Sequence, residues 1–141
     1  MSVIKLKMNY LCIMQIHFIG ATETVTGSKH LLETASGFKV LLDCGLYQGM
    51  GKDTEPMNRN LGLIPSDINA VILSHAHIDH SGNLPLLVKE GFLGSIFCTP
   101  QTLELVEVLL YDSAKIHESD IKYVNKRRAW ARFIDAFIYI N

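Results

Sequence analysis

The chain has 141 residues, of which 48% are hydrophobic and 19% charged, and its formal net charge is -1. This length suffices for one domain with one core and is too short for two ordinary domains. A nearly neutral chain gives no electrostatic reason to expect nucleic acid, because phosphate binders usually carry a strongly basic face. No apolar run reaches the roughly 18 residues of a spanning helix, so we expect no membrane partner.

The cysteines are an odd and widely spaced set, Cys12, Cys44 and Cys98, without a Cys-x-x-Cys pair. This spacing indicates neither a disulfide framework nor a cysteine-based zinc module. Residues 8–19 contain polar side chains and lack a small-residue cleavage pattern, which argues against a signal peptide. We therefore expect a cytoplasmic protein.

The first half of the chain reads as strands and loops. We expect residues 1–13 to be an extension, because the period-two strand pattern begins near Met14, which is also a possible start codon. The predicted elements are then a strand Gln15 to Ile19, a loop Gly20 to Ser28, and a hairpin of strands Lys29 to Thr34 and Phe38 to Leu42. Asp43 follows directly, so a carboxylate lies at a strand terminus, where sites of layered α/β proteins are commonly assembled.

The second half alternates strands with helices. The predicted elements are a long loop Gly49 to Pro65, a buried strand Ala70 to Ser74, a short helix Gly82 to Glu90, a strand Ser95 to Cys98, and a helix from Pro100 to about Glu118. The last stretch, Phe133 to Ile140, is apolar and rich in β-formers, a composition prone to edge pairing.

Four potential metal ligands, His75, His77, Asp79 and His80, lie within six residues directly after the predicted buried strand. In an extended segment, side chains two positions apart point to the same side, so His75 and His77 can converge on one ion. Asp79 and His80, beyond a turn, then point at a second position, as two-metal hydrolysis requires. The alternative is a His-rich surface loop, but the strand before the motif and the helix after it favour a metal site.

Several stretches together resemble the metallo-β-lactamase superfamily and, within it, the β-CASP branch of RNA-processing nucleases. They are Gly20 to Leu32, which contains Val25-Thr26-Gly27-Ser28, Leu42 to Gly49, which contains Asp43-Cys44-Gly45, Ser74 to Gly82, and Asp112 to Ile116. The resemblance implies the N-terminal part of an αββα sandwich in the layered α/β class.

The resemblance also implies roles for the site residues. His75 and His77 would bind one zinc ion, Asp79 and His80 a second, and Asp79 would be catalytic. Asp43 would hydrogen-bond the ring of a ligand histidine and fix its tautomer, as carboxylates beside metal ligands commonly do. The implied reaction is phosphodiester hydrolysis of RNA by a metal-bound hydroxide.

The family pattern continues with a third ligand histidine, a bridging aspartate, a late histidine and the inserted β-CASP domain, none of which this sequence contains. We therefore predict an extension at 1–13, a partial metallo-β-lactamase domain at 14–128 and a divergent tail at 129–141. We expect a truncated or frameshifted reading frame, little activity from this chain alone, and self-association through an uncovered sheet surface.

Two alternatives stay open. The first is a thioesterase or lactonase of the glyoxalase type, for which the Val25 to Ser28 and Asp43 to Gly45 matches would not be expected together. The second is a non-catalytic fragment that binds metal weakly or associates through its open face. Assays with a phosphodiester and a thioester separate the first, and metal stoichiometry per chain separates the second.

Overall fold

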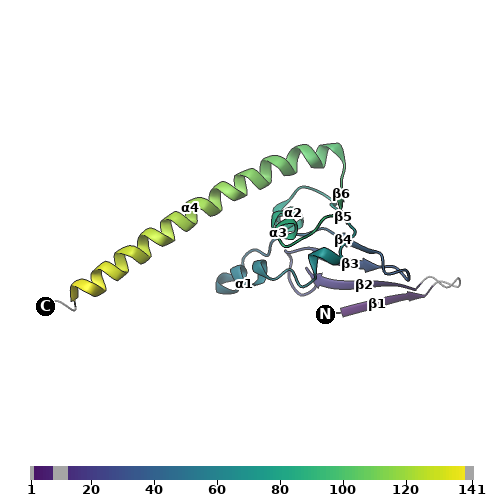
Figure 1. Ribbon diagram of the computed structural model, residues 1–141, viewed down its shortest axis with the longest axis horizontal. Helices are drawn as coiled ribbons and strands as arrows, with labels where there is room; N and C mark the ends of the chain where they lie inside the picture. Colours follow the sequence, from purple (N-terminus) through teal and green to yellow (C-terminus); the bar gives the residue numbers. More distant parts are fainter. Residues whose placement is uncertain (1, 8–12, 139–141) are drawn as a thin grey trace. The chain divides into compact units, whose positions relative to one another are not determined.

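The computed structural model describes residues 2–7 and 13–138. A six-stranded sheet runs in chain order from β1 to β6 (Figure 1). Its strands are β1 (Ser2–Lys7), β2 (Ile13–Gly20), β3 (Lys29–Glu33), β4 (Lys39–Leu42), β5 (Ala70–Ile72) and β6 (Ser95–Phe97). The helices are α1 (Thr54–Arg59), α2 (Ile78–Ser81), α3 (Leu84–Lys89) and α4 (Pro100–Ile138), with short 3-10 turns at Gly51–Asp53 and Pro65–Asp67. The predicted mixed α/β class is confirmed.

The sheet changes its pairing direction at β4. Strands β1 to β4 pair antiparallel, whereas β4, β5 and β6 pair parallel. The predicted β3–β4 hairpin is confirmed, and its turn contains Gly37 at φ 81°, in the left-handed region that glycine enters without strain. A parallel neighbour requires a crossover connection, so the chain between β4 and β5 runs through α1, and that between β5 and β6 through α2 and α3.

The core lies where the parallel strands meet the short helices. Leu41 of β4, Val71 of β5 and Leu87 of α3 are fully buried, and Phe92 after α3 is nearly so. Leu41 and Val71 are register partners on adjacent strands. Burial of side chains of this size contributes about 1.5–3 kcal/mol each, which anchors the strand ends that carry the site.

The structure adds elements to the first 90 residues that were not predicted. The predicted extension contains β1, which pairs with β2 along its whole length. The predicted loop Gly49 to Pro65 contains α1, and the single predicted helix Gly82 to Glu90 is two short helices, α2 and α3. Strand pairing partners and helix packing decide these details, and neither is visible in local periodicity.

The predicted end of the last helix, near Glu118, is wrong, because α4 continues to Ile138. No Gly or Pro interrupts residues 101–138, so the backbone meets no helix breaker. The predicted β-prone tail from Phe133 is therefore helical as far as Ile138, and its residues 139 and 140 lie outside the described part. None of the described helices is long and apolar enough to cross a membrane.

The chain divides into two compact units, Met1–Leu109 and Leu110–Asn141. The first contains the sheet, the short helices and the beginning of α4, and the second contains the remainder of α4. In the second unit His117 is an exposed residue of α4. The domain boundaries predicted after residues 13 and 128 remain predictions.

Candidate functional site

The site is built where two parallel strands end side by side. Leu42 and Ile72, the last residues of β4 and β5, are register partners. Asp43 follows the first and Ser74 lies two residues after the second, so both reach the carboxyl edge of the sheet. The Asp43 N–H donates to Ile72 O at 3.0 Å, which holds the two strand ends together. Layered α/β proteins commonly place ligands at such an edge.

Asp43 is buried and adopts φ 58°, a left-handed conformation that short polar side chains tolerate better than most residues. Its carboxylate accepts four hydrogen bonds. Oδ1 accepts from the Ser74 N–H at 2.8 Å, and Oδ2 from Ser74 Oγ at 2.9 Å, from His80 Nδ1 at 2.7 Å and from Ser28 Oγ at 3.4 Å. Hydrogen bonds from several donors fix the orientation of this carboxylate.

The predicted ligands lie on both sides of one helix start. His75 and His77 lie in the irregular segment after β5, and His77 is the N-cap of α2 with an extended backbone, φ -56° and ψ 146°. Asp79 and His80, which were predicted to lie beyond a turn, lie on the short helix α2. The structure brings the rings together: the centroid of His75 is 4.8 Å from that of His77 and 4.0 Å from that of His80.

The donor atoms are of the kinds that zinc binds, and the distance between one pair of them suits a shared zinc ion. Zinc takes imidazole nitrogen and carboxylate oxygen at about 2.0–2.2 Å, so two ligands on one tetrahedral ion stand roughly 3.4 Å apart. His80 Nε2 and Asp79 Oδ2 are 3.6 Å apart. Among the described residues, no three such side chains converge closely enough to hold an ion. The described part of the chain therefore supplies pairs of ligands and not a three-ligand site.

Backbone hydrogen bonds clamp the ligand helix to the loop after β4. The N–H groups of Cys44 and Leu46 donate to the carbonyls of His80 and Ile78, at 2.7 and 3.0 Å. The Ser28 N–H donates to Asp79 O at 2.9 Å, so the loop before β3 also holds the ligand helix. Each ligand-bearing residue of the helix thus has its main chain held from outside the helix.

Gly45 is the point of closest approach in this clamp. A Cβ built on Gly45 would lie 1.6 Å from Asp79 O and 2.7 Å from the His80 N. Both atoms are main-chain atoms that cannot move aside as a flexible side chain could. Only glycine, which has no Cβ, permits the main chain at position 45 to lie this close to the main chain of Asp79 and His80. This close contact explains why Asp43-Cys44-Gly45 occurs together with the His motif.

A buried lysine supports the same loop. Lys29 is fully buried, and its Nζ donates to Gly45 O at 3.0 Å and lies 4.6 Å from the centre of the Tyr47 ring. Burial lowers the pKa of Lys29, an effect that Cys44 partly offsets. Burial also raises the pKa of the Cys44 thiol to about 12, and the pKa of Tyr47 is raised by the same cause. The loop behind the ligands is therefore a poorly solvated region.

Sequence reasoning missed four residues that organise the site, Ser28, Lys29, Gly45 and Ser74. All four lie inside the stretches that carried the family resemblance, but no role was predicted for any of them. Much of what they bond to is distant in the chain: Ser28 bonds to Asp43 15 positions away, Lys29 to Gly45 16 positions away, and Ser74 to Asp43 31 positions away. No local periodicity could have identified these contacts.

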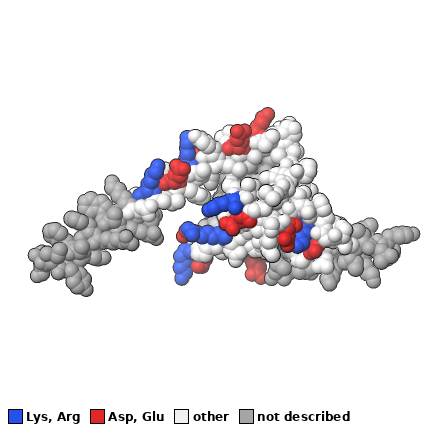
Figure 2. Space-filling model, in the orientation of Figure 1, with Lys and Arg blue, Asp and Glu red and all other residues white. Residues whose placement is uncertain are grey.

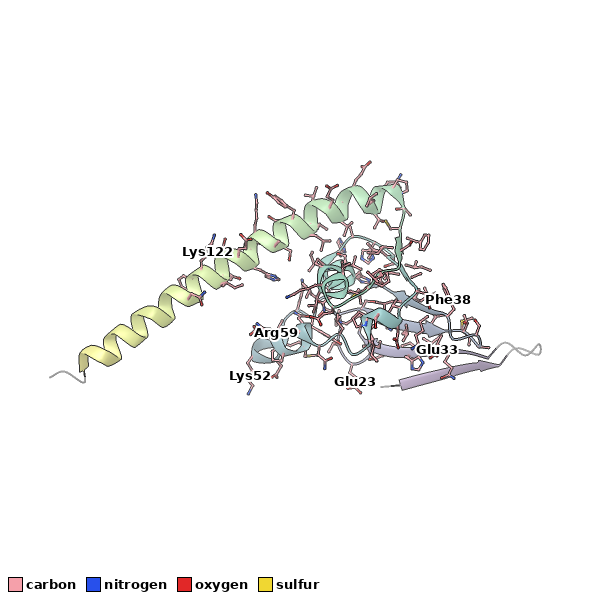
Figure 3. The ribbon with its side chains drawn as sticks, viewed as in Figure 1. Glu23, Glu33, Phe38, Lys52, Arg59 and Lys122 are labelled. Carbon is pink, nitrogen blue, oxygen red and sulfur yellow. The ribbon has the colours of Figure 1, made fainter. Side chains whose placement is uncertain are left out.

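An apolar hollow of about 640 Å³ adjoins the site on the sheet. Its wall includes Ser74 and side chains of β4 to β6, and the full set is Phe38, Val40, Ala70, Ile72, Leu73, Ser74, Phe97, Cys98 and Thr99. Phe38, which Figure 3 shows beside the β3–β4 hairpin, is 48% exposed, and Phe97 is 58% exposed. Large apolar side chains are thus exposed in the hollow that Ser74 helps to line.

Charges of both signs lie on the surface. On the face shown in Figure 2, lysine and arginine side chains lie among aspartate and glutamate side chains. Pairs such as Lys39 with Asp67, 3.1 Å apart, partly neutralise each other. The near-neutral net charge of the sequence is thus matched on this face, where positive and negative side chains lie close together.

Comparison with known proteins identifies the family. The profile described as the metallo-beta-lactamase superfamily matches residues 28–135. Ribonuclease TTHA0252 of Thermus thermophilus is 45% identical over 103 residues, which cover 73% of this chain and 23% of that protein. Transcription termination factor FttA of Cenarchaeum symbiosum is 38% identical over 100 residues, covering 70% of this chain and 15% of that protein.

Two further matches extend this comparison. Cleavage and polyadenylation specificity factor 73 of Drosophila melanogaster is 38% identical over 107 residues, covering 74% of this chain and 15% of that protein. Among solved structures, the metallo-beta-lactamase fold protein YhfI of Bacillus subtilis is 26% identical with a TM-score of 0.38, covering 55% of this chain and 30% of that one. This chain spans less than a quarter of the three curated relatives. It belongs to the metallo-β-lactamase superfamily, in its β-CASP branch.

Proposed function

We propose that this chain carries part of the site of a zinc-dependent hydrolase of the RNA-processing nuclease type. The observation that carries the proposal is the Asp43–His80 hydrogen bond beside the clustered rings of His75 and His77. A carboxylate that orients a ligand imidazole is the usual surrounding of a histidine metal site. The relatives named ribonuclease and termination factor support RNA as the substrate class.

In this proposal His75 and His77 hold one zinc ion, and Asp79 and His80 hold a second. Bound zinc would lower the pKa of water and neutralise charge that develops on phosphate oxygens. Asp43 accepts a hydrogen bond from His80 Nδ1, which would leave the lone pair of His80 Nε2 free to bind a metal ion. Asp79 is the proposed catalytic carboxylate. We also propose that the protein works in the cytoplasm.

Two ligands for each ion are fewer than the three protein ligands typical of catalytic zinc. Two loosely held zinc ions would not keep the attacking and leaving oxygens in line. A misplacement of about 1 Å can reduce the rate on the order of a hundredfold. We therefore expect negligible RNA cleavage by the isolated chain. Zinc stoichiometry per chain tests whether it binds metal at all.

The nuclease function is tested in a chimera. The matching segment of ribonuclease TTHA0252, which is 45% identical to this chain, is replaced by the present sequence. We expect the chimera to cleave single-stranded RNA with zinc and to lose this activity with His77→Ala. A folded, zinc-loaded chimera that cleaves a thioester and leaves RNA intact would favour the thioesterase or lactonase alternative. No zinc bound by the chain or the chimera would refute the metal site.

A further inference from the structure

The hydroxyl of Ser74 lies between the Asp43 carboxylate and two ring nitrogens. Ser74 Oγ is 2.9 Å from Asp43 Oδ2, 3.0 Å from His75 Nδ1 and 3.4 Å from His80 Nδ1. Nothing in the metal-ligand assignment uses this hydroxyl. Its position raises the question of which of the three neighbours receives its single proton.

The carboxylate settles the direction of these hydrogen bonds. An ionised carboxylate can only accept, and a hydrogen bond to a charged acceptor is roughly twice as strong as one between neutral groups. Ser74 Oγ therefore donates to Asp43 Oδ2, and the same carboxylate receives the proton on His80 Nδ1. The Ser74 oxygen then has only lone pairs to offer to His75.

A neutral imidazole has one donor and one acceptor nitrogen, and its partners select the tautomer. Because Ser74 Oγ can only accept from His75, the proton of His75 is on Nδ1. Its Nε2 then carries the lone pair that a metal ion needs. We infer that Ser74 is a positioning residue, which extends the orienting effect of Asp43 to His75 and fixes its metal-binding tautomer.

The inference rests on the proposed function and deepens it, because it links the two ligand pairs. Asp43 contacts His80 directly and His75 through Ser74, so one carboxylate orients one ligand of each pair. Loss of the Ser74 hydroxyl should change the tautomer of His75 only. Loss of the Asp43 carboxylate should change the tautomers of both His75 and His80.

The test is the tautomer of His75 in the metal-free full chain. Long-range proton–nitrogen correlation spectra of uniformly nitrogen-15-labelled protein, in mildly alkaline buffer, show which ring nitrogen carries the proton. His75→Gln and His80→Gln assign the signals. In the wild-type chain we expect Nδ1–H for both. Ser74→Ala should shift His75 towards the Nε2–H form that free histidine favours, while His80 stays unchanged.

Two variants serve as controls. Ser74→Thr retains a hydroxyl and should retain the wild-type tautomer, and Ser95→Ala removes an exposed serine from β6 and should change neither ring. An Nε2–H His75 in the wild-type chain overturns the inference without any variant. Retention of Nδ1–H in Ser74→Ala overturns it as well.

Zinc affinity, measured by competition with a chromophoric chelator, supplies the second readout. Loss of a residue that orients a metal ligand typically weakens metal binding 10–100-fold, so we expect a weakening of about that size in Ser74→Ala and little change in Ser74→Thr. Equal affinities for Ser74→Ala and Ser95→Ala would contradict the inference. If the wild-type chain binds no zinc but Ser74→Ala still changes the tautomer, the positioning role stands and the proposed function fails.

Discussion

The Asp43 carboxylate and the His80 ring, 37 positions apart in the chain, meet across 2.7 Å from Oδ2 to Nδ1. The two residues meet because β4 ends beside β5 and because the main chain of His80 is bonded to Cys44. This hydrogen bond leads to the first prediction.

Asp43→Asn should weaken zinc binding about 10–100-fold, because the neutral amide replaces a charge-assisted hydrogen bond to His80. Asparagine also tolerates the left-handed backbone at this position, so the fold should persist. Chelator competition measures the affinity. Asp67→Asn, which removes an exposed carboxylate paired with Lys39, is the matched control. Equal affinities for the two variants would show that Asp43 does not orient a ligand.

The double variant His75→Ala plus His77→Ala should abolish binding of one of the two expected zinc ions. These rings supply the ligand pair that precedes α2, with centroids 4.8 Å apart. Zinc content after dialysis, measured by atomic absorption, gives the stoichiometry. His117→Ala, a change to an exposed histidine on α4, should leave it unaltered. Unchanged metal content in the double variant refutes the ligand assignment.

Gly45→Ala should destabilise the fold by about 3 kcal/mol, the upper end for overpacking, because its Cβ would meet the main chain of Asp79. Urea unfolding followed by circular dichroism measures the change. Gly37→Ala is the control, because Gly37 has a positive φ but open space around it. This variant should therefore lose only the roughly 1–2 kcal/mol that a left-handed backbone costs an alanine. A smaller loss for Gly45→Ala than for Gly37→Ala would disprove the close contact.

The Cys44 thiol should resist alkylation in the native protein even at pH 9. Burial raises its pKa from 9.0 to about 12, and the thiolate is the reactive form. Iodoacetamide labelling followed by peptide mass spectrometry separates Cys44 from the half-buried Cys98, which should react first. Addition of urea should expose Cys44 to the reagent.

The same shift predicts a pH dependence of stability. Between pH 9 and 12 the unfolded chain loses the Cys44 proton while the native chain keeps it, so this contribution to stability is lost as pH rises. Cys44→Ala should remove that part of the decline. Rapid native labelling of Cys44, or an identical pH profile for Cys44→Ala, would contradict the burial of this thiol.

The chain should self-associate through the apolar hollow on β4 to β6, where Phe97 and Ile72 are 58% and 48% exposed. Light scattering at tens of micromolar should detect oligomers. Phe97→Glu should reduce them by placing a charge on the exposed surface, whereas Leu93→Glu, at a 95% exposed position outside the hollow, should not. A stable wild-type monomer at these concentrations would argue against the prediction.

The sequence by itself determined the cluster of four potential metal ligands, the β3–β4 hairpin and the order of strands and helices around the His motif. These features depend on local spacing: period-two patterns, turn residues, and four donors within six positions. The family resemblance followed from the same stretches, because close main-chain packing demands particular residues such as Gly45 at fixed places.

Only the tertiary structure decided which atoms meet. The parallel pairing of β4 with β5 brings Asp43 to Ser74, and the clamp from Cys44 and Leu46 sets the position of His80. Such outcomes depend on contacts between residues far apart in the chain, whose energies local propensities do not contain.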